Sequence, residues 1–249
     1  MTVNPTACVL IIGNEILSGR TQDGNLNYLA RKLGEAGIPV REARVVPDVP
    51  EEIISAVNAC RAKYTYVFTT GGIGPTHDDI TAENVAKAFG VPLERNAVAM
   101  QILTDYYAAQ GTTVNEARAR MANAPVGARL LENPVSKAPG FALGNVFVLP
   151  GVPKIMQAIF DLLLPTLSGG PPVVMKTITC QLREGDLAAD LAAIQEQFPQ
   201  IDIGSYPNMR SGNFITQLVC KGSDAAAVQA ACDAVADMVR KMGGKPEFE

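Results

Sequence analysis

Short apolar runs alternate with amphipathic segments in the first part of this chain, and this alternation constrains the fold more than any other feature. Residues 8–12 form a continuous apolar run that ends at Gly13, a pattern typical of a strand buried on both faces of a parallel sheet. Residues 39–46 and 64–70 are predicted to form two further strands, and a helical pattern precedes each of them. The sequence therefore predicts an α/β fold in which helices cover both faces of a parallel sheet.

A glycine-rich segment follows the third predicted strand and carries two adjacent carboxylates. Gly71, Gly72 and Gly74 allow positive φ angles and let a ligand approach bare backbone N–H groups, as a phosphate cradle requires. Asp78 and Asp79 add hard oxygen ligands that magnesium accepts beside substrate phosphates. The segment thus predicts a phosphate and metal site. The alternative is an ordinary turn in which an aspartate only caps a helix.

The two aspartates are expected to differ in role. Thr81 is placed to cap the next helix, so the aspartates are not both needed for capping. Adjacent side chains in an extended loop point in opposite directions, and only one is expected to face a metal. Asp79 is predicted to bind the metal because it lies near the helix N-terminus, and Asp78 to brace the loop. His77 has no second histidine or cysteine at ligand spacing and is expected to face solvent.

Two further carboxylates are expected at the same end of the sheet. Glu15 follows the first predicted strand, and Asp48 follows the second. Ligands of parallel sheets bind beyond the carboxyl ends of the strands, so the topology brings Glu15, Asp48 and residues 71–79 to one rim. From position alone, ordinary polar loop residues are an equal alternative for Glu15 and Asp48.

Several motifs give the chain a family resemblance. Residues 70–81 read Thr-Gly-Gly-Ile-Gly-Pro-Thr-His-Asp-Asp-Ile-Thr, and residues 13–19 read Gly-Asn-Glu-Ile-Leu-Ser-Gly. Later in the chain come Asn133-Pro134, Ala138-Pro139-Gly140-Phe141 and Pro150-Gly151-Val152-Pro153. These motifs resemble those of the MoaB/Mog molybdopterin-binding superfamily, and in particular those of CinA proteins and of the N-terminal domain of eukaryotic FAD synthases. The resemblance covers about residues 7–167.

The motifs and the resemblance together imply a candidate site. Its catalytic residues are Asp78, Asp79 and Glu15, and its metal ligands are Asp79 and Asp78. The implied metal is magnesium, manganese or cobalt, and molybdopterin is a further ligand that the superfamily implies. The residues expected to bind substrate or phosphate are Gly71, Gly72, Gly74, Thr76, Asn133, Lys137, Pro139, Gly140, Pro150 and Gly151. For Lys137, a phosphate contact and simple solvation have equal weight.

The stretch after the glycine-rich segment is predicted to be mostly helical. Residues 96–122 have a helical pattern interrupted at 111–113, and a packed helical hairpin is preferred to a lid or an oligomer contact. Its apolar side would hold Val98, Ile102 and Tyr106. The basic residues of this stretch are expected on solvated helix faces; they include Arg118 and Arg120.

The later part of the first domain is predicted to add two strands and a helix. Residues 129–131 and 146–149 form the strands, and residues 154–167 form the helix, whose core-facing residues are Ile155, Ile159, Leu162 and Leu163. Many CinA proteins have a glutamate and a methionine after the Pro-Gly-Val-Pro motif, whereas this chain has Ile155 and Met156. In this respect it resembles the FAD-synthase branch more closely.

The chain is expected to contain two domains. Residues 1–167 form the MoaB/Mog-like domain, residues 168–172 (Ser-Gly-Gly-Pro-Pro) form a linker, and residues 173–249 form a small α+β domain. The second domain has the predicted order βαββα, with a hairpin loop over 207–212. Because its polar residues form no chemical constellation, it is interpreted as structural or interface-forming, and a homo-oligomer is expected.

Charge and composition exclude several classes of protein. The formal net charge is −4, and neither side of Gly170 has an excess of basic residues, so no nucleic-acid partner is expected. The five cysteines form no CxxC pair and suit reduced thiols in a cytoplasm. No run approaches the ~20 apolar residues of a membrane span, so no membrane partner is expected and the protein is predicted to be cytoplasmic.

Three functions fit these features. The chain has no GxxxxGK[ST] and no GxSxG motif, and the chemistry that remains is that of a phosphate beside a metal. The resemblance implies a metal-dependent pyrophosphatase acting on ADP-ribose or FAD, and this is the preferred interpretation. A molybdopterin-binding or adenylyl-transfer protein is the second, and a non-catalytic ligand-binding module is the third.

Overall fold

The computed structural model describes residues 4–210 and 213–248, and the chain divides into two compact units after Gly170. The predicted linker, 168–172, spans this division. Its first residues pack on the first unit, because the Ser168 N–H donates to the Tyr66 hydroxyl oxygen (3.1 Å) and the Gly170 N–H to the Gly37 carbonyl (3.0 Å).

The described residues of the first unit contain a six-stranded sheet with the spatial order β2-β1-β3-β8-β7-β6. Its strands are β1 (Ala7–Ile12), β2 (Val40–Val46), β3 (Tyr66–Thr70), β6 (Arg129–Leu131), β7 (Gly140–Leu143) and β8 (Val146–Leu149). β2, β1, β3 and β8 pair in parallel, whereas β7 pairs antiparallel with both of its neighbours, β8 and β6. The mixed α/β fold with a mostly parallel sheet confirms the predicted class. β7 was not predicted, because a four-residue run that begins with glycine resembles a loop.

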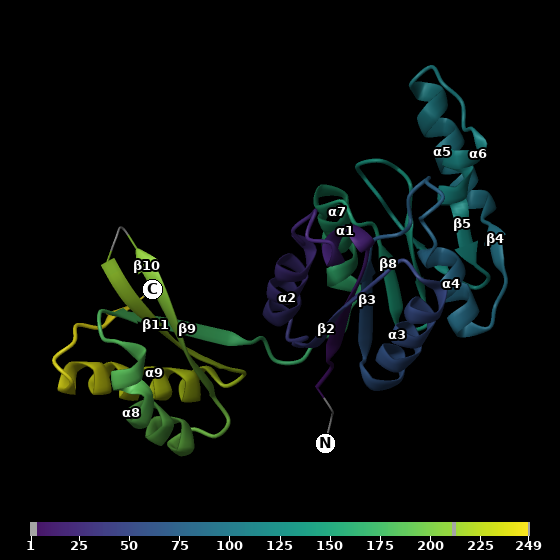
Figure 1. The fold of residues 1–249 in the computed structure, drawn as a ribbon. Coiled ribbons are helices and arrows are strands. Elements are labelled where there is room, and N and C mark those ends of the chain that lie inside the picture. The colour runs from purple at the N-terminus through teal and green to yellow at the C-terminus, as the bar shows by residue number, and fades with distance from the viewer. Residues whose placement is uncertain (1–3, 211–212, 249) are drawn as a thin grey trace. The chain divides into compact units, whose positions relative to one another are not determined.

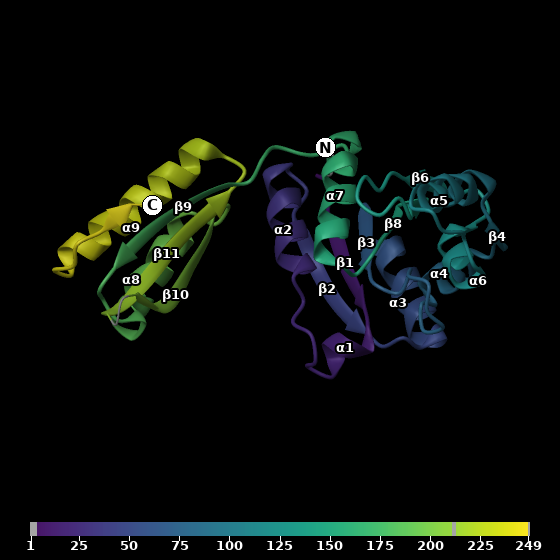
Figure 2. The same cartoon turned by 90° about the horizontal axis from the view of Figure 1, so that it is seen from above.

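Helices cover both faces of this sheet (Figure 2). Alternate side chains of β1 point to opposite faces: Val9 and Ile11 join one core, and Leu10 and Ile12 the other. The first core packs under α2 (Asn25–Glu35) and α7 (Pro153–Leu163), and the second under α3 (Pro50–Lys63) and α4 (Thr81–Phe89). This three-layer arrangement leaves the strand ends free at the two rims.

The core-facing stripe of α7 differs from the prediction. Leu162 is 50% exposed, while Met156 and Phe160 are buried beside Ile159 and Leu163. The buried positions follow the spacing i, i+3, i+4 and i+7; Ile159 and Leu163 were predicted, and Ile155 is partly buried against the same core. The short helix η2 (Leu164–Thr166) then ends the segment.

An arm of α5 (Ala97–Ala109), α6 (Glu116–Ala119) and η1 (Arg120–Ala122) extends beyond the sheet (Figure 1). Two short strands that were not predicted, β4 (Leu93–Arg95) and β5 (Asn123–Pro125), pair at its base. Val98, Ile102 and Tyr106 share one side of α5, as predicted, but this side lies at the surface rather than in the core of the arm. Val98 is 62% exposed and Ile102 lies at the surface, whereas Ala99 and Leu103 are buried against Ala122.

The second unit is a small α+β domain. Its elements are β9 (Val174–Cys180), α8 (Glu184–Gln197), β10 (Asp202–Arg210), β11 (Asn213–Gly222), α9 (Ala225–Lys241) and β12 (Glu247–Phe248). Its antiparallel sheet has the order β10-β11-β9-β12, so the predicted βαββα order is present with one strand added. Most of the predicted hairpin loop is strand, because Pro207 lies on the edge strand β10, where a missing N–H is tolerated. Residues 211–212 of that loop lie outside the described residues.

None of the helices in the described part of the chain has the length and apolar character that crossing a membrane requires.

Candidate functional site

The loops after β1, β2 and β3 enclose a cavity of about 490 Å³ at the carboxyl ends of these strands. We call it the acidic cavity, because four carboxylates line it. The residues that line it are Ile12, Gly13, Asn14, Glu15, Ser18, Arg20, Asp48, Gly72, Thr76, Asp78 and Asp79. The parallel order of these strands thus places Glu15, Asp48 and the glycine-rich loop on one rim, although they are far apart in sequence.

Gly71 begins the glycine-rich loop directly after β3. Its φ is +101°, and an added Cβ would lie 2.1 Å from the carbonyl oxygen of Ile12, so a side chain has no room there. The Gly71 carbonyl accepts a hydrogen bond from the Thr81 hydroxyl (3.0 Å). The predicted capping role of Thr81 was therefore wrong: its hydroxyl fixes the loop, and Ile80, at the N-cap of α4, provides no side-chain cap.

Backbone N–H groups remain free in the middle of the loop. Gly71 donates its N–H to the Leu149 carbonyl (3.1 Å) and cannot serve a ligand. In the described part of the chain, no acceptor takes the N–H groups of Gly72, Ile73 and Gly74. These three groups are therefore available to phosphate oxygens.

Asp79 braces the loop. Its Oδ2 accepts the backbone N–H of Thr76 (2.8 Å) and the Thr76 hydroxyl (2.6 Å), and an added Cβ at Gly74 would lie 2.6 Å from the same oxygen. This is the turn-bracing geometry that the sequence analysis assigned to Asp78. The hydrogen bonds therefore favour the reverse assignment of the two aspartates.

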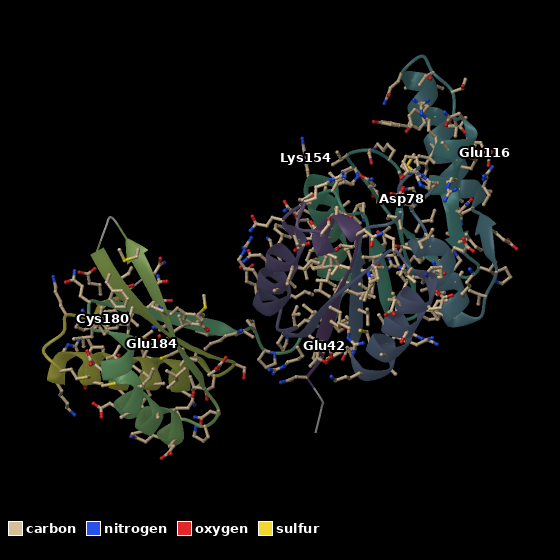
Figure 3. The ribbon with its side chains drawn as sticks, viewed as in Figure 1. Glu42, Asp78, Glu116, Lys154, Cys180 and Glu184 are labelled. Atoms are coloured by element: carbon tan, nitrogen blue, oxygen red, sulfur yellow. The ribbon has the colours of Figure 1, made fainter. Side chains whose placement is uncertain are left out.

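Asp78 is exposed at the mouth of the acidic cavity, at the end of the unit shown in Figure 3 opposite Glu42. The Thr76 side chain and the Asp78 backbone N–H hold the pKa of this carboxyl below its usual range, and nearby His77 adds a smaller effect. Asp78 is therefore ionised at neutral pH. His77 itself is exposed.

The first two loops supply the other carboxylates. Asp48 accepts the backbone N–H of Asn14 (2.8 Å) at the start of the short helix α1 (Asn14–Leu17), so it ties the loop after β2 to the loop after β1. Glu15 folds back over Gly13, where an added Cβ would come within 2.6 Å of its carboxylate oxygens. A residue larger than glycine at position 13 would displace Glu15.

Several predicted binding residues lie in a different cavity. Asn133, Lys137 and Pro139 line an apolar cavity of about 590 Å³ beside Val98, Ile102 and Tyr106 of α5. Asn133 is buried and uses its amide within its own turn: it accepts the N–H groups of residues 135 and 136 and donates to the Ala138 carbonyl (2.7 Å). Lys137 takes a positive φ of 63°. The structure thus separates this motif from the acidic cavity.

The remaining predicted residues support the loops by close backbone packing. An added Cβ at Gly151 would lie 3.3 Å from the Cα of Gly71, and one at Gly140 would lie 2.6 Å from the Val148 carbonyl. Pro150 follows β8 and leads into this contact. Asn25 was not predicted as a site residue; it is buried and donates from Nδ2 to the Gly151 carbonyl (2.8 Å). No local signal identifies it, because its partner is far away in sequence.

A third cavity, of about 230 Å³, also touches the glycine-rich loop. We call it the arginine cavity, because Arg95 and Arg120 line it. The other residues that line it are Gly72, Ile73, Gly74, Asp79, Ala82, Glu83, Leu93, Glu116, Met121, Asn123, Pro139 and Phe141. Gly72 and Asp79 line both this cavity and the acidic cavity. Neither arginine was assigned to the site from the sequence.

A divalent cation fits the chemistry of the acidic cavity only if the ligand completes its coordination. The described residues contain no group of three or more His, Cys, Asp or Glu side chains placed to hold a metal ion. Magnesium commonly binds one or two carboxylates and takes its other ligands from water and substrate phosphates. Asp78 and Glu15 are suitable for this role, because Asp48 and Asp79 already tie the backbone of other loop residues, Asn14 and Thr76.

Family models match both units. Residues 8–169 match the family described as "Probable molybdopterin binding domain", and residues 172–244 match the middle domain of FAD synthase. The two matches meet close to the division between the units.

Relatives cover most of the chain. A protein of Pyrobaculum calidifontis is 40% identical over 212 residues, which are 82% of this chain and 81% of that protein. A protein of Aeropyrum pernix is 35% identical over 216 residues, 83% of this chain and 81% of that protein. Among solved structures, the CinA protein of Thermoplasma acidophilum, described as of unknown function, is 36% identical with a TM-score of 0.61. The match covers 66% of this chain and 98% of that one.

Proposed function

Because this chain belongs to the molybdopterin-binding domain family, we propose that its first unit binds a nucleotide or pterin phosphate and hydrolyses the pyrophosphate bond of a dinucleotide such as ADP-ribose or FAD. The family and the match to the FAD synthase middle domain support a small-molecule ligand of this class. The pyrophosphatase activity, the metal ion and the substrate are parts of the proposal.

The acidic cavity is the observation that carries this proposal. It joins a loop with free backbone N–H groups to four carboxylates at the ligand-binding rim of an α/β sheet. Carboxylates alone would repel a pyrophosphate. Their presence beside a phosphate cradle favours a cation between the two, with Asp78 and Glu15 as its ligands.

Different residues of the site would have different roles in this hydrolysis. The N–H of Gly72 would stabilise the negative charge that develops on the phosphoryl oxygens. Asp79 and Thr76 would keep the loop in shape through their two hydrogen bonds. A cation held by Asp78 and Glu15 would polarise the phosphoryl group and lower the pKa of a bound water. Water adds to one phosphorus atom and the P–O–P bond breaks, which gives AMP and a second phosphate monoester.

The second candidate function is binding without hydrolysis, or adenylyl transfer, on molybdopterin. The description of the matched family favours this candidate. The two functions share the rim of the sheet and differ in whether the bound phosphate reacts.

The test is an incubation of the protein with FAD or ADP-ribose in the presence of magnesium, manganese or cobalt. Chromatography then measures the AMP that is released. We expect release with at least one metal and none with EDTA. Asp78→Asn should lower the rate at least about tenfold, which is about 1.4 kcal/mol of barrier. Asp105→Asn is the matched control, because this carboxylate lies on α5 and outside the acidic cavity. Ligand-induced stabilisation without AMP release would favour the binding module, and no response to any ligand would refute the proposal.

A further inference from the structure

Arg120 reaches the glycine-rich loop from the arm. It is the first residue of η1, and its Nη2 donates to the Asp79 carbonyl oxygen (3.4 Å). Figure 3 places Glu116, on the neighbouring α6, at the same end of the unit as Asp78. A cationic side chain from the arm therefore lies against the loop that carries the carboxylates.

The wall of the arginine cavity is suited to an anion. Gly72, Ile73 and Gly74 line it, and these are the residues whose N–H groups have no acceptor in the described part of the chain. Adjacent free N–H groups in a glycine-rich turn favour phosphate oxygens.

The charges in the arginine cavity leave Arg120 available. Arg95 pairs with Glu116 (2.6 Å), and Glu83 pairs with Lys87 (2.8 Å). Within residues 4–210 and 213–248, Arg120 forms no ion pair, and the Asp79 carbonyl takes only one of its donors. A guanidinium group has five N–H donors in a planar fork that matches a phosphate group.

We propose that the arginine cavity binds a second phosphate of the ligand, with Arg120 as its charge partner and the free N–H groups of the loop as its other donors. This inference rests on the proposed function, in which the first phosphate lies in the acidic cavity. Gly72 and Asp79 line both cavities, so a ligand with two linked phosphates can contact both sides of one loop. The ligand class is therefore a diphosphate rather than a monophosphate, and Arg120 determines that preference.

Inorganic pyrophosphate is the probe that tests Arg120 separately from hydrolysis. Calorimetric titration of the full chain with magnesium present should show binding that Arg120→Gln weakens at least about tenfold, the scale of a charge-assisted hydrogen bond. Arg120→Lys keeps the charge without the fork and should lose less. Arg118→Gln is the matched control, since Arg118 stacks on Tyr107 and bonds the Thr113 carbonyl (2.7 Å) away from the loop. It should leave pyrophosphate binding unchanged.

A second experiment compares the binding of ADP-ribose with the binding of AMP, both in the presence of magnesium. Arg120→Gln should weaken ADP-ribose binding about tenfold and AMP binding less than about twofold. Three outcomes would overturn the inference, provided that thermal melting shows the variant folded. They are equal losses of affinity for ADP-ribose and AMP, no pyrophosphate binding by the wild type, and no effect of Arg120→Gln on binding. Pyrophosphate binding that depends on Arg120 without any AMP release would support the inference while the proposed hydrolysis fails. If Arg120→Gln leaves both metal-dependent AMP release and pyrophosphate binding unchanged, the proposed hydrolysis is supported and the inference about Arg120 fails.

Discussion

At the scale of single residues, hydrogen bonding separates the roles of Asp78 and Asp79. Asp79 accepts two hydrogen bonds from Thr76, whereas Asp78 is exposed and lines the acidic cavity. We predict that Asp78→Ala raises the metal concentration needed for half-maximal activity or binding at least about tenfold, or about 1.4 kcal/mol. Asp79→Ala should instead remove about 1 kcal/mol of stability and lower Tm by about 2–4 °C, because the loop loses its brace.

The two variants control for each other. Metal titration followed by ligand binding and thermal melting should give opposite patterns for them. If Asp79→Ala alone changes the metal dependence while Asp78→Ala alone lowers Tm, the original assignment from the sequence is correct and the one favoured by the hydrogen bonds is wrong.

At the scale of the elements, a cluster around Glu42 joins β2 to the end of α3. Glu42 accepts hydrogen bonds from Tyr64, from Lys63 (2.9 Å) and from Arg44. These hydrogen bonds lower the pKa of Glu42 from 4.5 to about 2, and the bond from Tyr64 has the largest effect. Because the folded-state pKa is lowered, the stabilisation is present above the unfolded pKa and is lost as the pH falls from about 4.5 through about 2.

The prediction for this cluster is a pH-dependent stability difference. Glu42→Gln should be less stable than the wild type at pH 7, and the difference should shrink over that acidic range. Denaturant unfolding at a series of pH values measures it. Glu35→Gln is the control, because the ion pair that Glu35 forms with Arg31 is exposed and of the kind that contributes little. A difference between Glu42→Gln and wild type that is constant from pH 7 to pH 2 would contradict the prediction.

At the scale of the whole molecule, the division between the units falls inside the predicted linker, and the first part of that linker is held on the first unit. Tyr66 and Gly37 hold Ser168 and Gly170 on the first unit, whereas residues 171 and 172 are exposed. We predict that a protease of broad specificity first cuts within 171–173 rather than at 168–170, and mass spectrometry of the fragments locates the cut. The fragment 1–170 should keep the ligand-induced stabilisation of the whole chain, because both cavities at the glycine-rich loop lie within it.

Tyr66→Phe is the matched variant for this prediction. It removes the hydroxyl that bonds Ser168, so additional cuts at 168–170 should appear. First cuts inside the sheet of the first unit would show that the units are not separate. The expected homo-oligomer and the cytoplasmic location stay predictions.

The sequence by itself determined the first three strands, the helices between them and the position of the rim. Apolar periodicity identified β1, β2 and β3 and the helices between them, because local residue patterns encode secondary structure. The order of these elements then required parallel pairing and placed Glu15, Asp48 and the glycine-rich loop at one end of the sheet.

The tertiary structure alone decided which side chains are free to act. Asp48 is engaged by Asn14, 34 residues away, and Arg120 contacts Asp79, 41 residues away. The motif at Asn133 lines the apolar cavity, and its polar groups form hydrogen bonds within their own turn. A sequence states which donors and acceptors exist, but packing selects their partners, since each hydrogen bond requires a distance and an angle that only the folded chain provides.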